Sequence, residues 1–365
     1  MALPGALLPV LLQRWQLQDA QGGTLFLLAW AGSSVGALLV RGSLRTTLVC
    51  GTSAIAVASF ALAFCGGHWV DIYICVYGMG LGLTMTTISL IRQRQAEDAG
   101  PEMVRLNLLW AIGACACPSL TMRAIHTGNG SPVFLGFSLA FCAAAGWAIF
   151  HPQPGLQIAS ATANRPWTIF RTTPFSLIAM AFLITGTEAC AGGWIATYAH
   201  RGMHTVAQTI AAPTCFWAGI LLSRLVWSVR KPPSGQGYLR VVRGSILLML
   251  CASIVLVASN QTLLVLLASG CLGFGIGPTY PLLLAWALRF QSGGAIFFIA
   301  GVGSAVLPWL TGLISSMCSS LRTGLFVPIG ASALMLVFSM LLPLSLISRP
   351  RDELQLDQAT KIEPR

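Results

Sequence analysis

The chain has 365 residues, of which 55% are hydrophobic and only 8% are charged, and its formal net charge is +11. A soluble domain is about 25% charged, so this composition excludes a cytosolic enzyme, a disulfide-stapled secreted domain and a disordered protein. We therefore predict an integral membrane protein whose main partner is the lipid bilayer. The basic residues form no continuous run, and nucleic acid is not expected as a partner.

Apolar runs bounded by charges or by Gly/Pro turns predict twelve membrane-spanning helices. Their continuous apolarity, without an alternation of period two, favours helices over a β-barrel. In chain order the predicted spans are 1–13, 22–41, 46–65, 69–91, 102–122, 132–150, 174–199, 204–227, 240–259, 261–287, 291–318 and 323–347. We expect an N-terminal six-helix bundle, a cytoplasmic linker, a C-terminal six-helix bundle and a cytoplasmic tail, over 1–150, 151–173, 174–348 and 349–365.

Lysine and arginine are distributed unequally between the two sets of loops. One set, together with the linker and the tail, holds 17 of the 21 basic residues, and the other set holds Arg14, Arg123, Arg201 and Arg322. Cytoplasmic loops carry an excess of Lys and Arg. The distribution predicts a multi-pass protein of the plasma (inner) membrane with its C-terminus in the cytoplasm.

The two halves of the chain resemble each other. Gly36-Ala-Leu-Leu-Val-Arg41 ends the second span, and Gly219-Ile-Leu-Leu-Ser-Arg224 ends the eighth span, 183 residues later. Glycine-rich segments, Gly78-Met-Gly-Leu-Gly82 and Gly273-Phe-Gly-Ile-Gly277, occupy the fourth and tenth spans. A shared offset near half the chain length predicts a parallel repeat of six helices, which one class of secondary transporters contains.

This pattern resembles the major facilitator superfamily over nearly the whole chain. The segment that begins at Gly36 is similar to the family motif between the second and third spans, although Val40 and Ser223 stand where the family often has Asp. The resemblance implies two six-helix bundles related by a pseudo-twofold axis. It also implies gating roles for the motif residues Gly36, Arg41, Gly219 and Arg224.

Within that superfamily, three segments resemble the fucose–proton symporter-like branch. They are Gly186-Thr-Glu188-Ala-Cys-Ala-Gly-Gly-Trp194 in the seventh span, Gly275-Ile-Gly-Pro278-Thr-Tyr-Pro281 in the tenth, and the Gly…Pro-Trp-Leu pattern of the eleventh. The branch implies transport of sugars or similar small polar solutes with protons as the coupling ion.

The first span is too short to cross a bilayer completely. An offset of 183 from the seventh span would place its start about ten residues before Met1. We expect that the sequence lacks part of its first helix.

Glu188 is the one acidic residue deep within a predicted span, because the other nine lie in loops, at span ends or in the tail. A buried ionisable group is costly in a membrane and is expected to face a cavity or a partner. Glu188 is therefore a candidate proton-coupling or substrate-binding carboxylate. The alternative is a protonated Glu that bonds a neighbouring helix.

No Lys, Arg or His is predicted at the depth of Glu188, and this favours a neutral, hydroxyl-rich solute or a cation over an anion. Sugar sites combine amide or carboxylate groups with an aromatic face. The further candidates of these types are Asn107, Trp110, Trp194, Gln208 and Tyr280. Each has an alternative role in helix packing or, for the tryptophans, at the membrane interface.

The remaining motifs indicate no cofactor and no metal site. The eleven cysteines lie in apolar stretches without a C-x-x-C pair, and no P-loop, nucleophile elbow or H-E-x-x-H is present. We predict a monomeric secondary transporter of a small, sugar-like solute, coupled to protons, and not an enzyme. The alternatives are a drug or metabolite exporter of the same fold and a receptor or scaffold that no longer transports.

Overall fold

The computed structural model describes residues 2–40, 42–66, 69–95, 99–151, 173–202, 205–229, 236–290 and 295–342. The predicted tail, and the predicted linker apart from residues 151 and 173, lie outside these ranges. The helices are α1 (Ala2–Arg14), α2 (Asp19–Leu38), α3 (Leu44–Phe64), α4 (Trp69–Gln95), α5 (Ala99–Leu120), α6 (Met122–Thr127), α7 (Ser131–Phe150), α9 (Phe175–Gly202), α10 (Val206–Val229), α11 (Gln236–Ala258), α12 (Thr262–Phe290), α13 (Ala295–Met317), α14 (Leu321–Gly324) and α15 (Phe326–Met340).

A helix lies at each of the twelve predicted spans, with α5 and α6 sharing one span and α14 and α15 another. Ten of these segments are long and apolar enough to cross a membrane. Large apolar side chains such as Phe60, Trp69, Phe150 and Phe175 are exposed on the outside of the bundle. A lipid-facing surface explains such exposure, and the chain is a multi-pass membrane protein.

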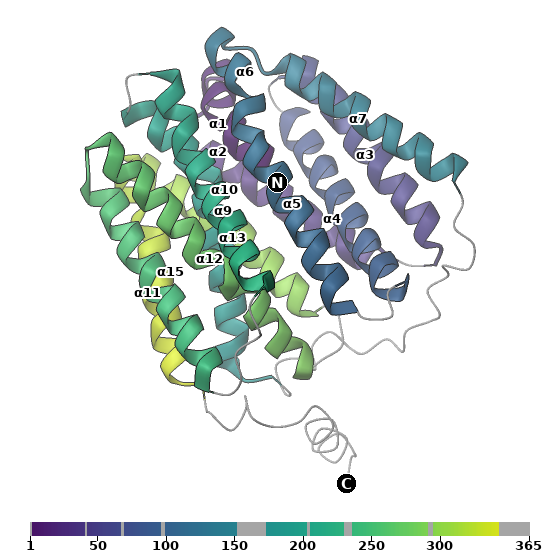
Figure 1. The fold of residues 1–365 in the computed structure, drawn as a ribbon. Coiled ribbons are helices and arrows are strands. Elements are labelled where there is room, and N and C mark those ends of the chain that lie inside the picture. The colour runs from purple at the N-terminus through teal and green to yellow at the C-terminus, as the bar shows by residue number, and fades with distance from the viewer. Residues whose placement is uncertain are drawn as a thin grey trace.

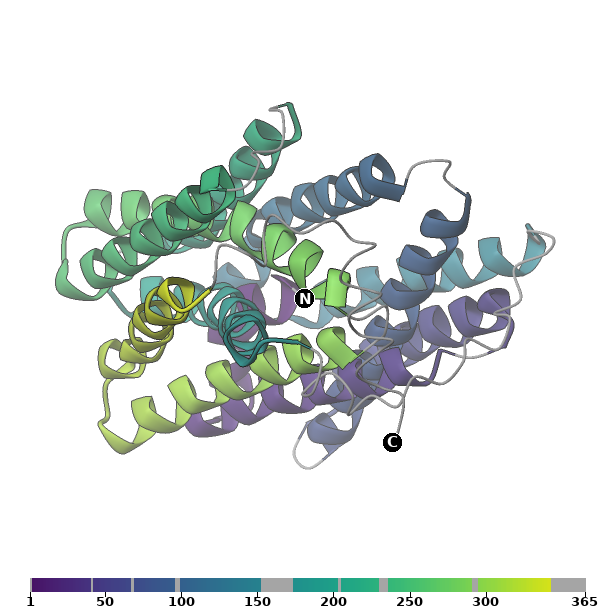
Figure 2. The ribbon, with the colours of Figure 1, turned by 90° about the horizontal axis from the view of Figure 1, so that it is seen from below.

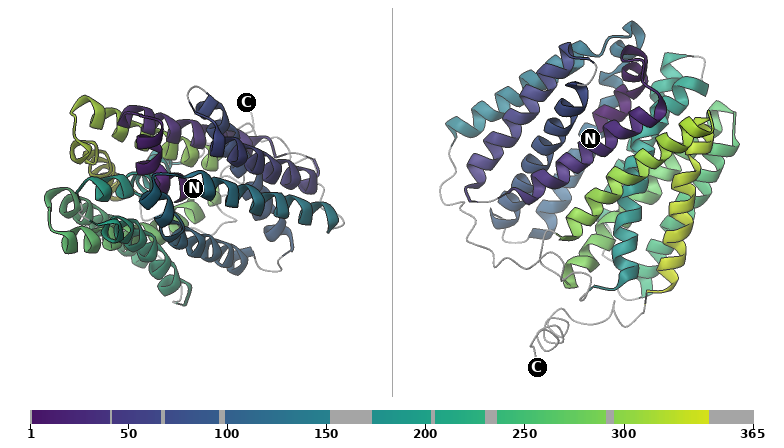
Figure 3. Two further views of the ribbon diagram at one scale, coloured as in Figure 1. Left: turned by 90° about the horizontal axis from the view of Figure 1, so that it is seen from above. Right: turned by 180° about the vertical axis from the view of Figure 1, so that it is seen from behind.

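Helices from the first part of the chain lie on one side of the molecule and those after residue 173 lie on the other (Figure 1). The most extensive contacts between the two sides are those of α2 with α13, α5 with α10 and α1 with α9. The antiparallel pair of α2 and α13 is seen side by side from below and from behind (Figures 2 and 3). The predicted fold, two bundles of six helices, is confirmed.

Glycines at repeated positions let corresponding helices approach closely in both halves. A Cβ atom on Gly78 or Gly82 would overlap backbone atoms of α2, and one on Gly273 would overlap the backbone of α10. The central glycines of the two segments face the next helix instead, Gly80 against α3 and Gly275 against α11. The repeat read from the sequence is therefore a repeat of helix contacts, which small residues permit in membranes.

Helix α1 is buried along nearly its whole length, unlike the lipid-facing α7. It begins inside the bundle, where a Cβ atom on Gly5 would overlap the carbonyl oxygen of Gly192 in the middle of α9. Its last residue, Arg14, donates hydrogen bonds to Ser131 Oγ at 2.9 Å and to the Ala63 carbonyl at 2.9 Å. Helix α1 thus fills the space between the two sides over one half of the bundle depth.

The connection between α1 and α2 lies at one end of the bundle. We call this end the closed end, because side chains and backbones from both sides meet there. Asp19 at the start of α2 accepts hydrogen bonds from both terminal guanidinium nitrogens of Arg201 on α9, at 2.7 and 2.6 Å. Ser315 on α13 donates a third hydrogen bond to the same carboxylate at 2.5 Å. Deeper in, a Cβ on Gly23 would come within 2.9 Å of the Trp309 carbonyl oxygen.

Candidate functional site

A cavity of about 250 Å³ lies between the two sides of the bundle, and seven helices contribute to its wall. Its volume is just below the ~300–1,000 Å³ of pockets for drug-sized ligands, which suits a solute of about monosaccharide size. The cavity lining includes Phe26, Trp30, Ser34, Asn107, Trp110, Glu188, Trp217, Arg224 and Tyr280.

The cavity occupies the half of the bundle away from the closed end. On α2 its lining begins at Phe26 and continues to Ala37, one residue before the helix ends. On α13 it includes Ala300, Gly301 and Ser304, all in the first half of that helix. Because α2 and α13 are antiparallel, both sets of residues place the cavity toward the end at which α7 ends and α9 begins.

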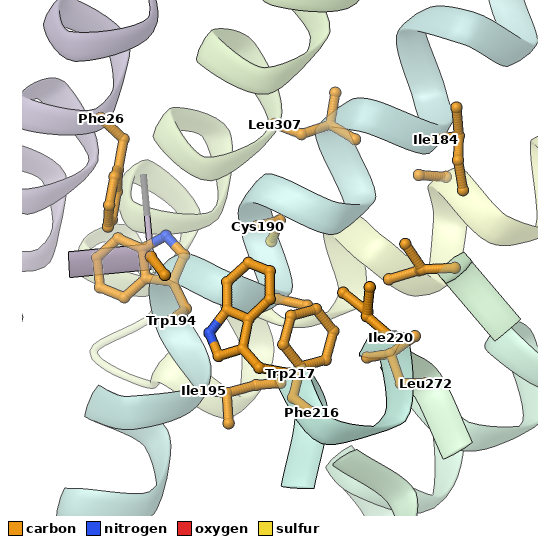
Figure 4. Close-up of a cluster of buried hydrophobic side chains, with 14 of the residues drawn as sticks. Phe26, Ile184, Cys190, Trp194, Ile195, Phe216, Trp217, Ile220, Leu272 and Leu307 are labelled. Carbon is orange, nitrogen blue, oxygen red and sulfur yellow. The ribbon is translucent and has the colours of Figure 1, made fainter. Parts of the chain in front are cut away.

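Aromatic rings close the cavity toward the other end. The Phe26 and Trp194 rings meet edge to face, with centroids 5.9 Å apart, and the Trp194 indole N–H donates to the Pro308 carbonyl at 2.9 Å. Trp194 is fully buried in the hydrophobic cluster beyond the cavity wall (Figure 4). The structure therefore places Trp194 in the core next to the cavity, where its ring and its N–H are both used in packing.

Glu188 lies midway along α9 and lines the cavity. Hydrogen bonds one turn away hold this part of α9 against α13, because Thr185 Oγ1 donates to the Ala300 carbonyl at 2.7 Å and Ser304 Oγ donates to the Thr185 carbonyl at 3.3 Å. The glycine that follows Thr185 permits a close approach, since a Cβ on Gly186 would come within 2.8 Å of the Gly303 oxygen. The carboxylate is thereby positioned by a fixed pair of helices.

Arg224 on α10 faces Glu188 across the cavity, with Nη2 3.7 Å from Glu188 Oε1. The expectation that no cation lies at the depth of Glu188 is wrong. In the sequence Arg224 is counted with the basic residues of the cytoplasmic side because it lies near the end of the predicted span 204–227, whereas α10 continues for five residues beyond it to Val229. The argument from a missing cation to a neutral solute therefore fails.

One tryptophan ring lies beside the guanidinium group, and a second tryptophan packs against the first. The Arg224 Cζ atom lies 5.1 Å from the centre of the Trp110 ring, and the Trp110 and Trp217 rings meet edge to face at 5.5 Å. A guanidinium group over an indole face is a favourable cation–π arrangement. The tryptophans also offer an apolar surface for the carbon skeleton of a solute.

Both charged groups of the pair retain unused hydrogen-bonding capacity. Among the described residues the buried Nε–H of Arg224 has no partner, and Nη1 reaches the Asn107 backbone oxygen at 3.5 Å. In the described part of the chain, no hydrogen bond to the Glu188 carboxylate accompanies the 3.7 Å ion pair. Buried charges are normally paired and hydrogen-bonded, so these two groups are poised for a further partner.

The structure brings four of the six predicted binding residues to one cavity, namely Asn107, Trp110, Glu188 and Tyr280. Gln208 lies apart from them, in the first turn of α10 near the closed end, where its backbone N–H is bonded to Thr205 Oγ1 at 3.2 Å. It does not line the cavity.

The four predicted gating residues have separate positions. Gly36 and Gly219 are sites of close helix contact, against Met79 of α4 and Gly270 of α12 respectively. Arg224 lies in the cavity, and Arg41 falls outside the described residues. Their gating roles stay predictions.

Sequence reasoning missed two features. It named no residue of α2 for the cavity, although Phe26, Trp30 and Ser34 line it. It also missed the group at the closed end in which Asp19 joins Arg201 and Ser315. A signal for the second was available, because Asp19 and Arg201 are charged residues at the ends of spans that the predicted topology places on the same side.

No protein-family model matches the chain, and no curated protein matches it in sequence. Among solved structures it is similar to the crystal structure of a point mutant of the nucleoside transporter NupG, with a TM-score of 0.70. The match covers 95% of this chain and 96% of that chain at 12% sequence identity. The likeness shows that the two proteins share a fold.

Proposed function

We propose that the chain is a secondary active transporter that moves a small polar solute by alternating access and couples this movement to protons. The observation that carries the proposal is the Glu188–Arg224 pair inside a central cavity lined from both sides of the bundle. In such transporters the site lies near the membrane midplane, and the two halves rock around it.

Alternating access requires a protein that is closed on one side of the site and able to open there. Asp19, Arg201 and Ser315 connect α2, α9 and α13 at the closed end, whereas the cavity extends to the other end of α2. The excess of Lys and Arg supports a cytoplasmic position for the linker. The described conformation then corresponds to a state closed to the outside.

Protonation of Glu188 is the proposed coupling step. With Glu188 ionised, Glu188 and Arg224 form a neutral pair in the cavity. A proton taken up by Glu188 abolishes this pairing and frees Arg224 for other contacts. The aromatic wall and the cavity volume support a sugar-like solute, and the fold shared with a nucleoside transporter adds nucleosides to the solutes worth testing.

The test is uptake of labelled monosaccharides, sugar acids and nucleosides into proteoliposomes, with and without an inward proton gradient. Gradient-stimulated uptake by the wild type is expected. In Glu188→Gln the gradient effect is expected to disappear while exchange at equal pH survives, because the amide retains the shape but cannot take a proton. Uptake of no solute, with or without a gradient, would contradict the proposal and favour a receptor of this fold.

A further inference from the structure

The chemistry of the cavity points to a more specific solute than its shape does. Resting on the proposed transport function, we infer that the solute is a small organic monoanion, a carboxylate on a hydroxylated carbon skeleton, that replaces Glu188 as the counter-ion of Arg224. Sugar acids and short hydroxy acids are of this class. The inference depends on hydrogen-bond supply, charge balance and geometry at Arg224.

Hydrogen-bond supply is the first argument. A guanidinium group has five N–H donors in a fixed planar fork. The Arg224 side chain is only 9% exposed, its Nε–H has no partner among the residues that the structure describes, and its distance to Glu188 is 3.7 Å, beyond a hydrogen bond. A carboxylate can accept from Nε–H and from a terminal N–H at once, as a bidentate pair. The cavity therefore offers the donors that such a group needs.

Charge balance is the second argument. In the described part of the chain, Glu188 and Arg224 are the charged side chains of the cavity wall, and Tyr280 on α12 is the other acidic or basic group. If Glu188 took a proton and a neutral solute bound, Arg224 would be left as a buried charge without a counter-ion, which is strongly unfavourable. A monoanion that enters together with the proton keeps the cavity neutral in both states.

This exchange of counter-ions also explains coupling. While Glu188 is ionised, the entry of an anion would place two negative charges beside one guanidinium group in a site of low polarity. Like charges at such distances repel strongly where water is scarce. The anion is therefore admitted when the carboxylate of Glu188 has accepted a proton from the side to which the cavity is open, and it departs as that proton is released on the other side.

The aromatic wall fits the remainder of such a solute. The Trp110 ring lies 5.1 Å from the Arg224 Cζ atom, and Trp217 meets it edge to face. An anion held by Arg224 would bring its carbon skeleton next to these rings. Hydroxyl groups on that skeleton could donate to the backbone and hydroxyl acceptors of the wall.

The experiment compares matched pairs of labelled solutes that share a carbon skeleton, gluconate with sorbitol and glycerate with glycerol, in proteoliposomes with an inward proton gradient. We expect the acids to enter at least tenfold faster than their neutral partners. Uptake of the acid should not respond to a membrane potential imposed with potassium and valinomycin, because one proton and one monoanion carry no net charge.

Variants then tie the selectivity to Arg224. Arg224→Gln is expected to lose acid uptake. Arg224→Lys is expected to retain part of it, because lysine supplies the positive charge but not the planar set of guanidinium N–H donors. In Glu188→Gln, acid exchange should persist and become independent of pH. Arg243→Gln is the matched control, because Arg243 donates to the Ser339 carbonyl at 2.9 Å, between α11 and α15 and away from the cavity.

Three outcomes separate this inference from the proposed function. Acid uptake that is electroneutral and lost in Arg224→Gln supports both. The second outcome is uptake of sorbitol or glycerol that equals acid uptake, is driven by the membrane potential and survives in Arg224→Gln. This outcome overturns the inference of a monoanion but leaves the proposed transport function standing. If neither member of any pair, nor any sugar or nucleoside, is taken up, both are overturned.

Discussion

In the part of the chain that the structure describes, two pairs of arginine and carboxylate bridge helices, and they differ in how completely they are bonded. At the closed end, Asp19 receives two hydrogen bonds of 2.6–2.7 Å from Arg201 and a third from Ser315. In the cavity, Glu188 and Arg224 approach only to 3.7 Å, and no described residue is a hydrogen-bond partner of the Arg224 Nε–H.

The difference separates a contact whose donors are used within the protein from one whose donors are only partly used. A bidentate pair with an additional donor stabilises one arrangement of helices, because its donors and acceptors are used within the protein. A loose buried pair contributes little to stability and keeps its donors for another molecule. Of the two, the closed-end pair is thus suited to holding α2, α9 and α13 together, and the cavity pair is suited to binding.

The largest expected effect comes from removing the cation of the loose pair. Arg224→Ala should weaken solute binding by at least about 30-fold, since loss of one partner of a buried charge pair costs about 2–5 kcal/mol. Binding of a labelled sugar acid to purified protein measures the loss. Arg201→Ala at the closed end should leave this affinity within a few-fold; an equal loss in both variants would remove the distinction between the pairs.

A substitution of intermediate effect compares two glycines of α13. Alanine at Gly312 would overlap the Asp19 backbone carbonyl, which is fixed in α2, whereas alanine at Gly301 would meet the terminal oxygen of Ser34, a side chain that can rotate. Gly312→Ala should destabilise the protein by about 1–3 kcal/mol, as overpacking does. Thermal unfolding in detergent checks this, with Gly301→Ala expected to remain close to wild type.

A smaller shift is expected when the charge of Asp19 is removed. Asp19→Asn should weaken the closed arrangement by about 1–2 kcal/mol, the scale of hydrogen bonds to a charged group, reduced here because the Arg201 side chain is 47% exposed. Spin labels at His126 and Gln261, exposed residues on opposite sides of this end, should show a larger population at the longer distance.

The control for that shift lies at the same end of the molecule. Arg322 donates to Asn260 Oδ1 at 2.5 Å, but both residues belong to the part of the chain after residue 173. Asn260→Ala should therefore leave the label distance unchanged. A distance distribution in Asp19→Asn identical to that of wild type would mean that the closed end is held by backbone packing alone.

The smallest effect concerns the aromatic wall. Trp110→Leu should weaken solute binding about 2- to 5-fold, because a cation–π contact at a partly exposed site is worth about 0.5–1 kcal/mol. Binding isotherms for wild type and variant measure it, with Trp147→Leu as the control, because Trp147 lies on the lipid-facing side of α7. Unchanged affinity in Trp110→Leu would mean that Arg224 binds the solute without a contribution from the Trp110 ring.

Much of the fold could be predicted from the order of apolar and charged residues. Each of the twelve predicted spans coincides with a helix, because the cost of unpaired backbone groups in lipid makes a long apolar run helical. The glycines Gly78 and Gly273, which recur in the two halves of the sequence, likewise indicate corresponding helix contacts. That Glu188 faces a cavity could be expected because a carboxylate inside an apolar helix needs a cavity or a partner.

The partners of Glu188 were decided by tertiary structure alone. Arg224 lies near the end of its predicted span and in the sequence is counted with the cytoplasmic basic residues, yet the length of α10 and its contact with α5 bring it into the cavity. For Trp194 the reverse holds. Its position six residues after Glu188 predicts a place in the cavity wall, but its contacts with Phe26 and Pro308 bury it in the core. Hydropathy fixes how deep a residue lies in the membrane, but which side of its helix faces a cavity depends on neighbours that are distant in the chain.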